Sequence, residues 1–125
     1  MDSALLLADT VSRTAGQGDP LALSYLSRGK RLKLTLGITR ILQQENLEVS
    51  VWGSRDGNRW ERLTAFPPRS YCGNYTTTVD LTRNPAIRFI RAHWNMTRWN
   101  VVDAPPVFGF HLLAEEVVDQ LAVGA

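Results

Sequence analysis

The sequence predicts an all-β protein, an antiparallel β-sandwich of about eight strands. Apolar and polar residues alternate along much of the 125-residue chain, as they do in strands with one face on a core and the other in solvent. Clusters of Gly, Pro, Asn, Asp and Ser separate the alternating runs at short intervals, which is typical of sandwiches and barrels. Helix is hard to place, except as a single turn in residues 117–125.

Turn-forming residues divide the chain into its expected elements. The breaks fall at residues 16–20, 27–30, 43–46, 56–57, 67–74, 83–85 and 99–106. Between these breaks we expect strands at residues 4–13, 20–26, 31–42, 47–54, 59–66, 74–81, 87–97 and 107–116.

Four of these strands carry an apolar row opposed by a polar one, and the four rows are expected to face a single core. Their members are Leu32, Leu34, Leu36 and Ile38; Leu47, Val49 and Val51; Ile90, Ala92, Trp94 and Met96; and Phe108, Phe110, Leu112 and Ala114.

The strongest local signal is a hairpin at Asp56-Gly57, between the alternating runs 47–54 and 59–66. Both residue types tolerate the positive φ that a tight hairpin turn requires, so we expect at least one of them to adopt it. Trp60, just after the turn, is expected to pack across the hairpin onto the edge of the core.

Length and composition favour one compact domain. We expect residues 1–117 to form a single β-sandwich domain and residues 118–125 a C-terminal tail, with 44% hydrophobic residues supplying the core. The net charge of only +2 predicts no nucleic-acid partner, and the short apolar run near the N-terminus predicts neither a signal peptide nor a membrane span. We therefore expect a cytoplasmic or virion-associated protein.

The hairpin also resembles a known family. Residues 49–60 hold the Ser-x-Asp-Gly-x-x-Trp pattern of discoidin-like (galactose-binding-like) domains, and residues 86–91 are similar to another strand of that family. Residues 5–9 and 107–112 resemble small β-sandwich proteins of phage and prophage structural gene clusters, which share this hairpin. The resemblance implies a jelly-roll sandwich. The chain departs from secreted discoidin-like domains because it lacks their Cys pair, and we expect it to lack their signal peptide as well.

The sequence predicts no catalytic residue, no cofactor and no metal site. No nucleophile, phosphate-binding or dinucleotide-binding motif occurs. His93 and His111 are out of phase with their apolar neighbours and are expected to be solvated surface residues without a third zinc ligand. Cys72 is the single cysteine, so no disulfide can form within the chain.

The candidate binding residues fall into two groups. Trp52 is out of phase with Val49 and Val51 and should lie on an outer strand face, where it either marks a contact surface or is covered by a loop or the tail. Strand parity places the loops 14–19, 43–46, 67–73 and 98–106 at one end of the sandwich and the turns 27–30, 55–58 and 82–86 at the other. The first end has the longer loops and carries the remaining candidates, Arg69, Tyr71, Arg98 and Trp99.

These observations lead to two functional hypotheses. The first is a non-enzymatic structural or protein-interaction sandwich, a phage- or prophage-type assembly component that self-associates or docks to another structural protein. The alternative is a carbohydrate- or small-ligand-binding module that uses the long-loop end.

Overall fold

The computed structural model describes residues 3–12, 15–23, 30–41, 45–69, 71–98 and 108–117. Within these residues the chain forms strands and no helix. The strands are β1 (Ser3–Ser12), β2 (Gly16–Gln17), β3 (Leu21–Ala22), β4 (Arg31–Ile41), β5 (Glu45–Ser54), β6 (Glu61–Ala65), β7 (Gly73–Asp80), β8 (Phe89–Arg98) and β9 (Phe108–Glu116).

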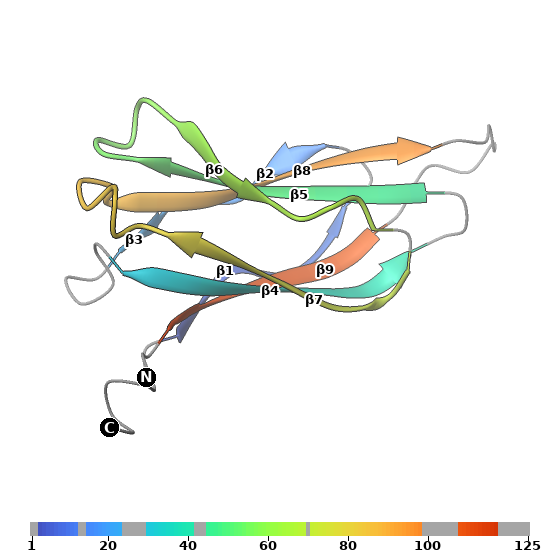
Figure 1. Ribbon diagram of the computed structural model, residues 1–125. Coiled ribbons are helices and arrows are strands. Elements are labelled where there is room, and N and C mark those ends of the chain that lie inside the picture. The colour runs from blue at the N-terminus through green and yellow to red at the C-terminus, as the bar shows by residue number, and fades with distance from the viewer. Residues whose placement is uncertain are drawn as a thin grey trace, which may run out of the picture.

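Two antiparallel sheets face each other (Figure 1). The β4 sheet has the strand order β1-β9-β4-β7, and the β5 sheet has the order β2-β8-β5-β6, with β3 also paired to β8. Because β2 and β3 pair in succession with the same strand, they act as one interrupted strand. Counted this way, the order is 1-8-3-6 in one sheet and 2-7-4-5 in the other, which is that of an eight-stranded jelly roll. The predicted fold class is confirmed.

The core lies between the two sheets and is built from the predicted apolar rows. Leu34 and Leu36 of the β4 sheet, and Leu47, Val51 and Ile90 of the β5 sheet, are fully buried. Burying one such side chain contributes roughly 1.5–3 kcal/mol, so these rows dominate the stability of the fold. Trp94 is half-buried and packs edge-to-face on Phe110, with ring centroids 5.4 Å apart. The side chains of Met96 and Phe108 lie outside the described residues.

The strand predicted at residues 20–26 differs most from the structure. Instead of a strand at 20–26, the chain forms β2 and β3, separated by Gly18, Asp19 and Pro20. Gly18 still donates its backbone N–H to the Ala92 carbonyl at 2.8 Å, but Pro20 has no N–H to donate, and the pairing with β8 resumes only at Leu21. Residues 24–26 lie outside the described part of the chain.

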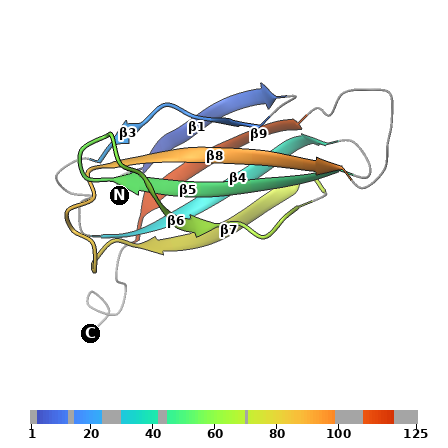
Figure 2. The same cartoon turned by 90° about the horizontal axis from the view of Figure 1, so that it is seen from above.

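The two ends of the sandwich follow strand parity where they are described. The turns at 55–58 and 82–86 lie at the same end (Figure 1), and the Arg88 N–H donates to the Ser54 carbonyl at 2.9 Å beside them. The segment that leads from β6 to β7 runs to the opposite end (Figure 2). Residues 14, 43–44 and 99–106, which belong to other predicted loops at that end, are not among the described residues.

Candidate functional site

Trp52 lies on the outer face of the β5 sheet. Val49 and Val51 of the same strand are buried in the core, so alternation turns Trp52 to the other side, as the sequence predicts. Its register partners are Arg91 of β8 and Arg62 of β6. The Trp52 side chain is half-buried, and the His93 ring on the same sheet face covers part of it.

Two contacts fix the indole ring. The Nε1–H of Trp52 donates to the Ser50 Oγ at 2.9 Å, and the ring stacks on His93 of β8 with centroids 4.9 Å apart and planes at 24°. Ser50 and His93 are direct register partners, so the sheet itself places all three side chains on one face. The hydrogen bond and the stack together restrict the orientation of the Trp52 ring on the sheet face.

An open hollow of about 420 Å³ lies over this face. Its lining combines the Trp52 and His93 rings with polar and charged side chains and with the segment that follows β6. The lining residues are Glu48, Val49, Ser50, Trp52, Arg62, Ala65, Phe66, Pro68, His93, Trp94 and Asn95. We call this surface the Trp52 face.

His93 differs from the solvated residue that the sequence predicts. Its Nε2 is buried and has no hydrogen-bond partner within the described part of the chain. Burial, and then the positive charge of Arg91, lower the pKa of His93 below its ordinary value of 6.5. The ring is therefore mainly neutral near pH 7, and it serves as an aromatic neighbour of Trp52. His111, on the other sheet, is also half-buried, and its ring lies over Gly37.

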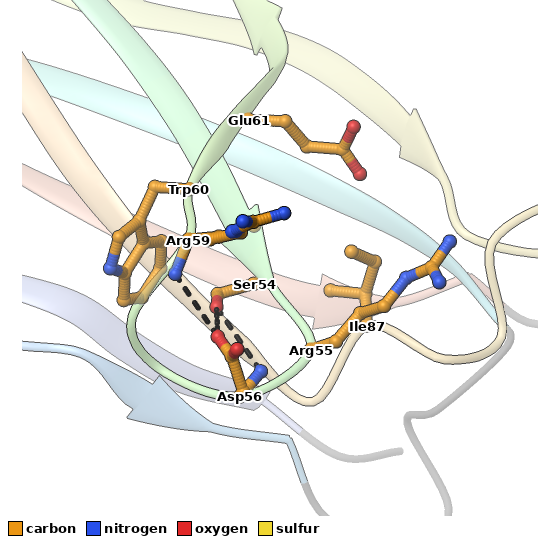
Figure 3. Close-up of a pocket in the computed structure, with 8 residues that line it drawn as sticks. Ser54, Arg55, Asp56, Arg59, Trp60, Glu61 and Ile87 are labelled. Atoms are coloured by element: carbon orange, nitrogen blue, oxygen red, sulfur yellow. Dashed lines mark hydrogen bonds between the residues drawn. The ribbon is translucent and has the colours of Figure 1, made fainter.

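The Ser-x-Asp-Gly-x-x-Trp segment is a self-contained turn (Figure 3). The buried Ser54 Oγ accepts the Gly57 N–H at 2.8 Å, and the Asp56 Oδ1 accepts the N–H groups of Asn58 and Arg59 at 2.8 and 3.0 Å. Gly57 has the expected positive φ, 82°. These bonds extend the connection through Trp60, so β6 begins at Glu61 and not at the predicted residue 59.

Trp60 contacts both the turn and the neighbouring strand β8. Its Nε1–H donates to the Gly57 carbonyl at 3.2 Å, and the Arg91 guanidinium lies 4.7 Å from the centroid of its ring. Arg91 also donates from Nε to the Gly18 carbonyl at 3.2 Å, which ties the turn to the β2–β3 edge. A second hollow of about 380 Å³ lies beside the turn, and the Ser54 Oγ and Asp56 Oδ1 that line it already make the turn's own hydrogen bonds. The motif therefore acts here as structure.

Arg69 and Tyr71 lie near each other at the loop end. Arg69 forms an isolated bridge with Leu47, with N···O distances of 2.8 and 3.1 Å, and its guanidinium lies 4.4 Å from the centroid of the Tyr75 ring. The Tyr75 hydroxyl donates to the Tyr71 carbonyl at 2.6 Å, while the Tyr71 side chain is 78% exposed. Cys72 beside it is a free, exposed thiol.

The predicted candidates do not form one site. Trp52 is five residues along β5 from Leu47, the partner of Arg69, which corresponds to about 17 Å of strand. Arg98 ends β8 opposite Glu45, and its side chain lies outside the described residues, as does the whole of Trp99. Sequence reasoning missed His93 as the partner of Trp52. Both residues are out of phase with their apolar rows, but only the register of β5 against β8 brings them together.

Comparisons with known proteins add little to this description. The sequence matches no model of a known protein family, and no curated protein matches it. Among solved structures, the chain is similar to one in the "Structure of infectious bursal disease virus Gx strain", with a TM-score of 0.44 and 11% identity over 90% of this chain. The chain spans 31% of that viral chain. A likeness at this level is too weak to carry a functional inference, and the discoidin-like resemblance is not confirmed.

Two further observations concern the described residues alone. They contain no helix that is long and apolar enough to cross a membrane. They also contain no group of three or more His, Cys, Asp or Glu side chains that could hold a metal ion.

Proposed function

We propose that this chain is a non-enzymatic structural or protein-interaction β-sandwich, an assembly component of the phage or prophage type that docks to further protein molecules through the Trp52 face. The observation that carries the proposal is the Trp52–His93 stack, held on the outer face of a sheet whose inner face already forms the core. Trp and Arg are enriched at the energetic centres of interfaces because they combine large apolar area with directed polar contacts. The Trp52 face offers both, with Arg62 opposite Trp52.

The size of the face limits the contact that it can make. β5 and β8 have 10 residues each, β6 has 5, and β2 and β3 have 2 each, so at about 3.3 Å per residue and about 4.8 Å between strands the face has an area on the order of 450 Å². One partner in a standard protein interface contributes about 800 Å². The Trp52 face is therefore smaller than one side of a standard interface and matches the low end of the range, at which contacts are transient.

The proposal is tested by light scattering on the purified chain over a series of concentrations. We expect the mean mass to rise with concentration, and we expect Trp52→Ala and Arg62→Glu each to reduce that rise. Arg62 is exposed, so the second variant removes the contact without opening the core. Tyr71→Ala is the matched control, because it removes an exposed aromatic residue at the other candidate surface.

Circular dichroism must show that each variant is folded. If Trp52→Ala and Arg62→Glu both leave the mass profile of the wild type unchanged, or if the wild type stays monomeric at all concentrations, docking through the Trp52 face between copies of this chain is wrong.

One observation also favours carbohydrate or small-ligand binding, although at a different place from the predicted loop end. The hollow over Trp52 is within the size range of ligand pockets and combines an aromatic ring with the polar groups of Glu48, Arg62 and Asn95. However, His93 already occupies one face of the indole ring, which leaves less of the ring for a sugar. Isothermal titration with a panel of mono- and oligosaccharides separates the two functions. Binding by a monomeric wild type that is lost in Trp52→Ala would favour the carbohydrate module.

A further inference from the structure

The four edges of the two sheets differ in how they are protected against pairing with another strand. An edge strand exposes unpaired backbone N–H and C=O groups, and proteins block such edges with bulges, prolines, charges or short strands. The β1 edge has two register shifts against β9. The β2–β3 edge is broken into two short pieces around Pro20. The β6 edge is short, bulged, charged at Glu61 and Arg62, and followed by two prolines.

The β7 edge has none of these features. β7 pairs with β4 over eight consecutive residues without a register shift, and its free side forms the rim of the β4 sheet (Figures 1 and 2). Its sequence, Gly-Asn-Tyr-Thr-Thr-Thr-Val-Asp, contains no proline and no charge before the terminal Asp80. Thr, Tyr and Val favour strands, and β7 is an eight-residue, regularly paired and nearly uncharged edge.

The pairing with β4 determines which backbone groups of β7 point outward. The Leu81 N–H donates to the Lys30 carbonyl at 3.0 Å, so Leu81 directs its N–H toward β4. Residues of an antiparallel strand alternate in this direction. The residues that direct their N–H and C=O groups to the free edge are therefore Asn74, Thr76, Thr78 and Asp80.

We propose that β7 pairs in antiparallel fashion with β7 of a second copy of this chain, about a two-fold axis at Thr77. This register places Thr76 opposite Thr78 of the second copy, and Tyr75 opposite Val79. It pairs all four outward-facing residues, because Asn74 then lies opposite Asp80. Thr–Thr and aromatic–β-branched pairs are favourable across strands.

The strand is self-complementary in this register, which is the reason for choosing a second copy as the occupant, and its charges allow the pairing. Asp80 is the one charged residue of β7, and in this register it meets the neutral Asn74, so no like charges are opposed. The contact is isologous and closes as a dimer with one continuous eight-stranded sheet. It lies on the β4 sheet and does not use the Trp52 face, so the inference goes beyond the proposed function.

The register is tested by disulfide cross-linking in a Cys72→Ser background, which removes the exposed native thiol. Thr77→Cys should form a disulfide-linked dimer on mild oxidation, because Cα atoms at a non-hydrogen-bonded antiparallel pair are about 4.5 Å apart, within disulfide range. Thr76→Cys alone is the matched control. It should not cross-link, because Thr76 and its own copy are offset by two residues, beyond the reach of a disulfide of about 7 Å.

Mixing two single-cysteine variants tests the same register in a second way. Thr76→Cys and Thr78→Cys chains should give little product separately and a disulfide-linked heterodimer together, because these positions face each other in the proposed register. The double variant Thr76→Glu/Thr78→Glu should be a monomer in light scattering, because in the proposed register each Glu at position 76 would lie opposite the Glu at position 78 of the second copy. The fold should remain, because Glu at position 78 lies opposite Lys33 of β4.

The outcomes separate this inference from the proposed function. A dimer that survives Trp52→Ala and is lost in the double Glu variant supports β7 pairing. Equal cross-linking of Thr76→Cys and Thr77→Cys, or association that the double Glu variant leaves unchanged, overturns it. Association that depends on Trp52 and not on β7 would overturn the inference while leaving the proposed function in place.

Discussion

Individual residues of the 54–60 turn have defined roles in holding it. Ser54 and Asp56 accept hydrogen bonds from backbone N–H groups of the turn. Gly57 adopts a positive φ, a backbone conformation that residues with a side chain rarely adopt. The Cβ of a residue at position 57 would meet the Phe89 ring at 3.9 Å, an ordinary contact. The cost of a substitution there comes from the backbone and not from a clash.

Because only the backbone conformation opposes a side chain at position 57, the effect of Gly57→Val can be predicted. The variant should lose about 1 kcal/mol or more of unfolding free energy, because a β-branched residue disfavours a φ of 82°. Urea denaturation followed by tryptophan fluorescence measures the loss. Asn58→Ala is the control, since Asn58 contributes its backbone N–H to the turn and keeps it in the variant. An unchanged denaturation midpoint in Gly57→Val would contradict the turn geometry.

His93 predicts a specific pH dependence. Its pKa in the folded chain is lowered by burial and by Arg91, so the unfolded chain binds the proton more readily. Where the unfolded state binds more protons, stability rises with pH. The contribution is therefore complete above the unfolded pKa of about 6.5 and is lost as the pH falls from there toward the lower folded pKa.

The measurement is the unfolding free energy of the wild type and His93→Phe at pH 7.5 and pH 5.5. The wild type should lose more stability between these two values than the variant does. Asp56 and Asp80 do not interfere, because hydrogen bonds hold the pKa of each below 3.8 and their contributions disappear only at more acidic pH. Equal losses in both proteins would show that His93 is not the titrating group.

At the scale of elements, β5 shows how two faces of one strand take different roles. Val49 faces the core at 1% exposure, while Glu48 faces the hollow on the other side. Val49→Asp should cost several kcal/mol, because it buries a charge with no partner in the core. Glu48→Asp, on the outer face of the same strand, should change the unfolding free energy by less than about 1 kcal/mol. Equal effects of the two changes in urea denaturation would show that the strand faces are assigned wrongly.

Much of this element-level picture could be predicted from the sequence. The period-2 rows at Leu32–Ile38 and Leu47–Val51 identified both strands and their buried faces, because alternation depends only on the strand itself. The interruption at Pro20 and the contact of Trp52 with His93 could not be predicted in the same way. The pairing of β2 and β3 with β8 on either side of Pro20, and the Trp52–His93 contact, depend on how one strand is aligned against another, and a single sequence does not state that alignment.

At the scale of the whole molecule, the two proposed contacts lie on different sheets. The Trp52 face belongs to the β5 sheet and the open edge belongs to β7 of the β4 sheet. A molecule with one face contact and one edge contact can join its neighbours in two directions, which suits a building block. Because the Trp52 face and the β7 edge belong to different sheets, a variant that tests one proposed contact leaves the residues of the other unchanged.

The position of β9 has a consequence for how the chain reaches this state. β9 is the last described strand, yet it lies between β1 and β4, far earlier in the sequence. Non-local pairing of this kind makes folding slow, on the scale of milliseconds to seconds in all-β proteins. Until β9 arrives, β1 lacks its partner and one side of β4 is open. The β9 strand of another chain has the same sequence and fits the same gap, so we expect a high concentration of unfolded chains to favour strand exchange between copies.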